Sequence, residues 1–120
     1  TDALYELFRT PRSYYYVAIE DNQVVGGCGI FPTDNLPDGT CELVKLYVAK
    51  EARGSGLGKE LMEKSMSWAK ENGYTQVYLE SMPELKKAVS IYEKVGFQPL
   101  DHPLGNSGHD GCDIWMLKAL

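Results

Sequence analysis

The sequence has little of what secreted, membrane-spanning or nucleic-acid-binding proteins usually need. Its three cysteines, Cys28, Cys41 and Cys112, form no CxxC pair and lie among apolar neighbours, which predicts buried free thiols and favours a cytoplasmic location. No apolar run approaches the roughly 20 residues of a membrane-spanning helix. The opening residues also lack the long apolar centre of a signal peptide, so we expect no membrane partner.

Positive charge is also scarce. Lys and Arg number 12 against 17 Asp and Glu, which gives a net charge of −5. Nucleic acids need clustered basic side chains, so this balance argues against them and makes a cationic small molecule or peptide the easier partner. A metal site is not expected, because His109 and Cys112 have HxxC spacing but no second pair of ligands accompanies them.

What is present fits one compact domain, with 120 residues of which 43% are hydrophobic. The patterns predict strands over residues 14–20, 24–31, 41–48, 75–81, 97–100 and 112–118, a short helix over 2–8, a helix over 58–72, and a helix that opens at Pro83 and ends at Gly96. Hairpin strands come first and crossover helices later. We therefore expect an α+β fold with a mixed, mostly antiparallel central sheet flanked by helices.

Side-chain patterns within these elements make three further predictions. Strict alternation over residues 41–48 places four side chains on one face of that strand: Glu42, Val44, Leu46 and Val48. Helical spacing gives the later helix a shared apolar face of Leu85, Ala88, Val89 and Tyr92. Three glycines inside the strand at 24–31, Gly26, Gly27 and Gly29, predict a bulge or a close contact with another group.

The stretch EARGSGLGKEL, residues 51–61, places three glycines between a strand and a helix. Bare main-chain N–H groups at a helix start form an anion site. The nucleoside-triphosphate loop fits poorly, because Gly54 to Gly58 is one residue short and Glu60 stands where its hydroxyl belongs. The dinucleotide fingerprint has Lys59 in place of its third glycine. A turn that serves only helix–strand packing remains an alternative.

Arg53-x-x-Gly56-x-Gly58 resembles the acyl-coenzyme A loop of the GNAT superfamily of N-acetyltransferases, whose signature is Arg/Gln-x-x-Gly-x-Gly/Ala. The segment AVSIYEKVGF, residues 88–97, is similar to that family's later helix, where a tyrosine precedes lysine, glycine and phenylalanine. The resemblance runs from about Tyr14 to the C-terminus and implies the GNAT fold. The family normally has a strand and one or two helices ahead of the first hairpin. We thus expect residues 1–120 to form a single domain whose N-terminal part is truncated or missing.

The resemblance implies acetyl-CoA as co-substrate, with no metal. Main-chain groups of Leu46, Tyr47 and Val48 would pair with its pantetheine arm, and a main-chain N–H near Tyr47 would stabilise the oxyanion. The loop residues would hold the diphosphate: Arg53, Gly54, Ser55, Gly56, Leu57, Gly58 and Lys59. Ser81 is a further candidate contact, although ESMPE stands where relatives usually carry Asn-type residues.

For catalysis, Tyr92 falls on the family's tyrosine and would protonate the departing thiolate. A buried aromatic on the helix face is the alternative for it. Glu42 matches the position of a catalytic glutamate in some members and would be the base. A solvated carboxylate, or a water chain as base, remains open.

The acceptor would be a primary amine of a small molecule or peptide, attacked directly in a ternary complex. Seven residues are candidates for its pocket: Tyr14, Tyr15, Tyr16, Asn106, His109, Asp110 and Trp115. A homodimer through the last strand is compatible with the sequence. A non-catalytic acyl-CoA-binding regulatory module is the alternative function, but it would have no use for Tyr92 or Glu42.

Overall fold

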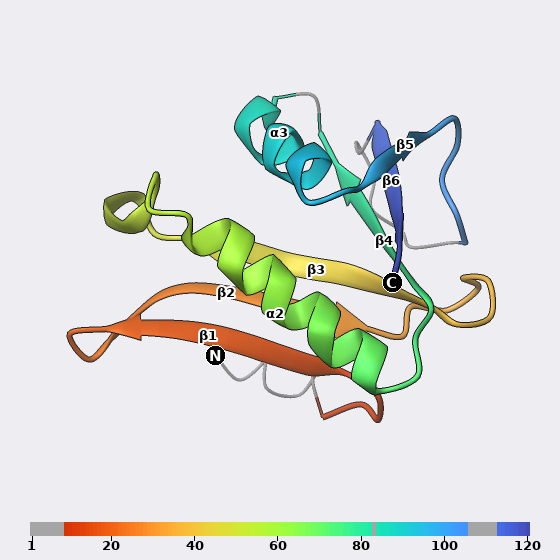
Figure 1. Ribbon diagram of the computed structural model, residues 1–120, viewed down its shortest axis with the longest axis horizontal. Helices are drawn as coiled ribbons and strands as arrows, with labels where there is room; N and C mark the ends of the chain where they lie inside the picture. Colours follow the sequence, from red (N-terminus) through yellow and green to blue (C-terminus); the bar gives the residue numbers. More distant parts are fainter. Residues whose placement is uncertain (1–8, 83, 106–112) are drawn as a thin grey trace.

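The computed structural model describes residues 9–82, 84–105 and 113–120 (Figure 1). The strands are β1 (Tyr14–Glu20), β2 (Gln23–Phe31), β3 (Thr40–Val48), β4 (Gln76–Ser81), β5 (Gln98–Leu100) and β6 (Ile114–Ala119). The helices are α2 (Leu57–Glu71) and α3 (Lys86–Lys94), and a 3₁₀ turn, η1 (Lys50–Ala52), links β3 to α2. Neither helix in these ranges is long and apolar enough to cross a membrane.

The strands form one mixed sheet in the order β1-β2-β3-β4-β6-β5, in which only the β3–β4 pair is parallel. This confirms the predicted fold class. The expectation of a dimer through the last strand stays a prediction. β6 pairs with β4 on one side and with β5 on the other, so the edges of the described sheet are β1 and β5.

The hydrophobic core lies on one face of the sheet, beneath α2 and α3. Side chains from both helices and from the strands share it: Cys28, Ile30, Cys41, Leu43, Met62, Met66, Val77, Leu79, Tyr92, Phe97 and Met116. α2 runs across β1, β2 and β3 (Figure 1). Tyr14 also faces this layer, since its ring stacks on Trp68 at 5.4 Å between centroids. The opposite face, called here the open face, carries neither described helix.

The predicted alternation of β3 is wrong beyond Val44. Gly29 pairs with Val44 and Gly27 pairs with Tyr47. Between these two pairs, β3 therefore has one residue more than β2. The bulge that the glycines predicted in β2 is present against β1, where Ala18 pairs with Gly26 and Ile19 with Val24, so that Val25 is the extra residue. The irregularity between β2 and β3 is a second one, and its extra residue lies in β3. Lys45 has a left-handed φ of 57° there. As a result, Leu46 and Val48 pack against the core with Leu43, whereas Glu42 points to the open face.

The later helix also starts differently. α3 begins at Lys86 rather than at Pro83, because Leu85 has a non-helical conformation (φ −94°, ψ 54°) and no side chain caps the helix. Leu85 is 45% exposed, so it does not belong to the apolar face that Tyr92 anchors. The short helix predicted over residues 2–8 lies outside the described residues.

Candidate active site

The turn that leads into α2 exposes a run of main-chain donors. Gly54 and Gly56 both have φ of 84°, a conformation that side chains disfavour. No N–H from residue 54 to residue 59 donates a hydrogen bond within the described part of the chain, and the first donor of the helix is Glu60, which bonds the Gly56 carbonyl at 3.1 Å. An added Cβ on Gly54 or Gly56 would meet no atom within 4 Å. Among the described residues, this turn therefore has unused main-chain donors and room beside its two left-handed glycines.

Two polar side chains of the loop stabilise the turn itself. Arg53 Nε donates to the Val48 carbonyl at 3.1 Å, and Ser55 Oγ donates to the Ala52 carbonyl at 2.6 Å. Both bonds fix the path of the chain between the end of β3 and the start of α2. The Ser55 hydroxyl is thus already used as a donor, and its main-chain N–H is the group left for a ligand.

Strands β3 and β4 separate beside this turn. They pair only from Thr40–Gln76 to Glu42–Tyr78, and their ribbons then diverge (Figure 1). Ala49 N–H bonds the Val25 carbonyl at 2.7 Å, on the β2 side of the chain. Because peptide groups alternate along a strand, those of Val48 and Leu46 point away from β2, toward the gap in pairing. The main chain of Tyr47, by contrast, faces β2, where Tyr47 pairs with Gly27.

β4 ends at Ser81. Because β3 and β4 are parallel, Ser81 lies at the same end of the sheet as the turn that follows β3. It is 3% exposed, and its Oγ has no hydrogen-bond partner among the described residues. Ser81 lies on the core face, two residues beyond Leu79 and on the side of the sheet that α3 covers. A buried hydroxyl without a hydrogen bond is costly, so Ser81 Oγ can bond a polar group brought to this end of β4.

Tyr92 projects from α3 into the core and is 7% exposed. Its ring meets Phe97 edge to face at 6.1 Å, and its hydroxyl makes no hydrogen bond within the described chain. Burial, and then the nearby Cys28, raise the pKa of Tyr92 to about 12. Cys28 belongs to β2 opposite the bulge, so Tyr92 approaches the bulged part of β3 from the helix side.

Glu42 lies on the open face and is 2% exposed. The Thr33 hydroxyl donates to its Oε1 at 2.5 Å. Beside it in register is Tyr78, whose hydroxyl donates to Glu80 Oε2 at 2.6 Å and accepts the Leu104 N–H at 3.1 Å. Burial, and then the bond to Glu80, raise the pKa of Tyr78. Glu42, at the last pair of β3 with β4, and Tyr92, in the core beneath α3, therefore lie on opposite faces of the sheet.

The Tyr78–Glu80 pair was not predicted as part of a site, although alternation in VYLES puts these two side chains on one face. Of the aromatic candidates for the acceptor pocket, Tyr14 and Tyr16 lie on the core face, whereas Tyr15 lies on the open face. Trp115 pairs with Glu80 and shares the open face. Three further candidates, Asn106, His109 and Asp110, lie outside the described residues.

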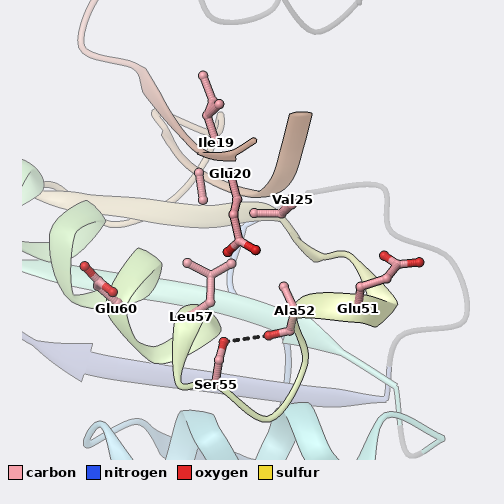
Figure 2. Close-up of a pocket in the computed structure, with 9 residues that line it drawn as sticks. Ile19, Glu20, Val25, Glu51, Ala52, Ser55, Leu57 and Glu60 are labelled. Atoms are coloured by element: carbon pink, nitrogen blue, oxygen red, sulfur yellow. Dashed lines mark hydrogen bonds between the residues drawn. The ribbon is translucent and has the colours of Figure 1, made fainter. Parts of the chain in front are cut away.

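A pocket of about 350 Å³ lies between the β1–β2 hairpin and one side of the turn before α2, where Ser55 and Leu57 line it. Figure 2 shows that three carboxylates surround it, those of Glu20, Glu51 and Glu60. No basic side chain lines it, so this pocket does not suit a diphosphate. Within the described ranges, no three His, Cys, Asp or Glu side chains gather to hold a metal ion.

Comparisons with known proteins agree on one family. The family model described as Acetyltransferase (GNAT) family matches residues 1–97. An uncharacterized N-acetyltransferase of Escherichia coli K12, YjgM, is 40% identical over 119 residues, which span 99% of this chain and 71% of that protein.

Two solved structures show the same fold at lower identity. A GNAT-family acetyltransferase from Staphylococcus aureus Mu50 superposes with a TM-score of 0.87 at 22% identity, over 99% of this chain and 75% of its own. A PaiA N-acetyltransferase from Thermoplasma acidophilum, solved in complex with coenzyme A, gives 0.73 at 23% identity, over 90% and 61% of the two chains.

Proposed function

The chain belongs to the acetyltransferase (GNAT) family, and from that membership we propose that it transfers the acetyl group of acetyl-CoA to a primary amine of a small molecule or peptide. Amine and thioester would react directly in a ternary complex. The observation that carries the proposal is the row of unused main-chain donors at residues 54–59, at the start of a 15-residue helix. A diphosphate supplies the acceptors that such a row lacks.

The residues around the turn fit the rest of acetyl-CoA. The main-chain groups of Leu46 and the Val48 N–H can pair with the amides of the pantetheine arm, while the Val48 carbonyl already accepts a hydrogen bond from Arg53 Nε. Ser81 Oγ, which is buried and has no hydrogen-bond partner in the described part of the chain, can bond a polar group of the same arm. The side chains of Arg53 and Lys59 add positive charge at the diphosphate. These side chains and main-chain groups of residues 53–59, together with Leu46, Val48 and Ser81, make up the proposed cofactor site.

The N–H of Leu46 or Val48 would also stabilise the oxyanion that forms when the amine attacks the carbonyl. Two protons leave the attacking ammonium group during the reaction. We assign Glu42 as the base that accepts the first from the open face. The second ends on the sulfur, which leaves as the thiol of coenzyme A.

Tyr92 would assist the departure of sulfur from the other face. A thiol has an ordinary pKa of about 8.5, whereas burial raises the pKa of Tyr92 to about 12. Complete proton transfer from the phenol to the thiolate is therefore unfavourable. A hydrogen bond from the Tyr92 hydroxyl stabilises the negative charge as it develops, without requiring a tyrosinate.

The test is thiol release from acetyl-CoA with a panel of amines, in the wild type and in Tyr92→Phe. Because the Tyr92 hydroxyl bonds nothing in the described chain, its removal should leave the melting temperature unchanged while kcat falls about 100-fold. Burial raises the pKa of both Cys28 and Cys41 to about 12, so neither is a reactive thiolate near neutral pH. A control reaction without amine measures the thiol signal that the protein itself contributes, which is subtracted from the signal with amine.

Three results would change this assignment. Tyr92→Phe with unaltered kcat would leave Tyr92 as a packing residue only. Calorimetric binding of acetyl-CoA without thiol release from any amine would favour the non-catalytic binding module. A folded wild type that gives no heat with acetyl-CoA at millimolar concentration would remove the proposed function.

A further inference from the structure

The side chain of Tyr15 spans from β1 across β2 to β3 on the open face. Its hydroxyl donates to the Lys45 carbonyl at 2.9 Å, 30 residues away in the chain. The ring lies over Gly27, where an added Cβ would come within 2.4 Å of the Tyr15 hydroxyl oxygen and 2.6 Å of its ring. The absence of a side chain at Gly27 is thus what lets Tyr15 reach β3.

The atom that Tyr15 binds belongs to the bulge. Lys45 has a left-handed φ of 57° and sits where the β2–β3 register shifts. A bulged residue leaves its peptide groups without the ladder partners of a regular strand. The Tyr15 hydroxyl supplies a donor to the Lys45 carbonyl in place of that partner. Burial raises the pKa of Tyr15, so the hydroxyl remains a donor throughout the neutral range.

The bulge decides how the following residues are presented. Past Lys45 the side chains of Leu46 and Val48 turn to the core face, and their peptide groups point toward the gap between β3 and β4. These are the groups to which the proposed function assigns the pantetheine arm and the oxyanion. A change in the Lys45 peptide would tilt the next N–H, and misplacement by about 1 Å can cost two orders of magnitude in rate.

We propose that Tyr15 is a positioning residue of the acetyl-transfer site, which holds the Lys45 bulge so that the Leu46 and Val48 amides face the thioester. This role rests on the proposed function. In this role Tyr15 acts through the main chain of β3, by its hydrogen bond to the Lys45 carbonyl, rather than by contact with either substrate. Gly27 contributes to this role, because the absence of a side chain there leaves room for the Tyr15 ring.

The experiment compares Tyr15→Phe, Gly27→Ala and the double variant with the wild type. Tyr16→Phe is the matched control, because it removes a hydroxyl from the neighbouring residue on the opposite face, where the described chain gives that hydroxyl no hydrogen bond. Steady-state kinetics with acetyl-CoA and a reactive amine give kcat and both KM values. ¹H–¹⁵N spectra of the ligand-free proteins report the amides of residues 45–48 directly.

We expect Tyr15→Phe to lower kcat about tenfold and to raise the KM for acetyl-CoA, with the KM for the amine unchanged. Gly27→Ala should do the same by displacing the ring, and the double variant should be no worse than the more damaged single variant. The amide signals of Leu46 and Val48 should move in Tyr15→Phe but not in Tyr16→Phe.

The role of Tyr15 is overturned if Tyr15→Phe matches Tyr16→Phe in kinetics and spectra, or if Tyr15→Phe and Gly27→Ala add as independent changes. In either case the wild type still turns over, and the proposed function stands. A wild type that neither binds acetyl-CoA nor releases thiol would remove the function and this role together.

Discussion

An added Cβ on Gly27 would lie 2.4 Å from the Tyr15 hydroxyl oxygen, whereas an added Cβ on Gly54 or Gly56 would meet nothing within 4 Å. Gly26 resembles Gly27, because its Cβ would lie 2.9 Å from the Tyr47 carbonyl oxygen and close to two leucines of α2. At Gly26 and Gly27 of β2, neighbouring atoms therefore leave no room for a side chain. Gly54 and Gly56, in the turn before α2, have free space around them and a left-handed backbone.

The contrast separates stability from binding. A crowded glycine lets the protein pack against itself, so its replacement should reduce the free energy of unfolding, and it can change activity only by displacing protein groups, as proposed for Gly27 and the Tyr15 ring. An uncrowded glycine beside unused N–H groups leaves room for something that is not protein, so its replacement should mainly weaken ligand binding. Substitutions at matched positions in the two segments can test this separation.

Gly26→Ala should give the largest loss of stability. The new methyl group would press on the main chain of β3 at the Tyr47 carbonyl, which cannot rotate away as a flexible side chain could. Overpacking of this kind costs about 2 kcal/mol. Urea denaturation monitored by circular dichroism measures the change. An unfolding midpoint equal to that of the wild type would show that β2 is less crowded than the structure indicates.

Gly56→Ala should have a smaller effect on stability and a clear effect on binding. Its φ of 84° costs an L-residue about 1 kcal/mol, and relief of this strain would turn the N–H groups at the start of α2 away from the diphosphate. We expect the dissociation constant for acetyl-CoA to rise about tenfold, measured by calorimetry, with the protein still folded at 25 °C. Unchanged affinity would separate this turn from the cofactor.

Much of the fold was predictable from the sequence because its signals are local. The alternation in β1 and β2, the turn between them and the helical spacing of α2 each depend on residues close together in the chain, and the observed bounds differ by one residue at most. The glycine loop was likewise identified from its spacing alone. Its free donors follow from the two left-handed glycines at 54 and 56.

The rest depended on residues far apart in the chain. The faces of Leu46 and Val48 reversed because Lys45 takes a left-handed φ, and its carbonyl is held by Tyr15, 30 residues earlier. No local pattern in CELVKLYV indicates the left-handed φ of Lys45 or its hydrogen bond with Tyr15. The position of β6 between β4 and β5 also could not be predicted from the sequence, because strand order depends on how distant strands pair. Alternation therefore misassigned Leu46 and Val48, which follow the bulged Lys45 whose carbonyl accepts a hydrogen bond from the distant Tyr15.

Gly58→Ala should give the smallest effect and is the sharpest test of the comparison. Gly58 lies two residues from Gly56 in the same turn, but its φ is not left-handed, and an added Cβ would meet Val48 Cγ2 at an ordinary 3.6 Å. Alanine in the first turn of a helix gains up to about 1 kcal/mol over glycine, so the unfolding midpoint should stay the same or rise slightly. Affinity for acetyl-CoA should change less than twofold. If Gly58→Ala instead weakened binding as much as Gly56→Ala, the open space around the turn would matter more than its left-handed backbone, and the ligand would have to contact Gly58 itself.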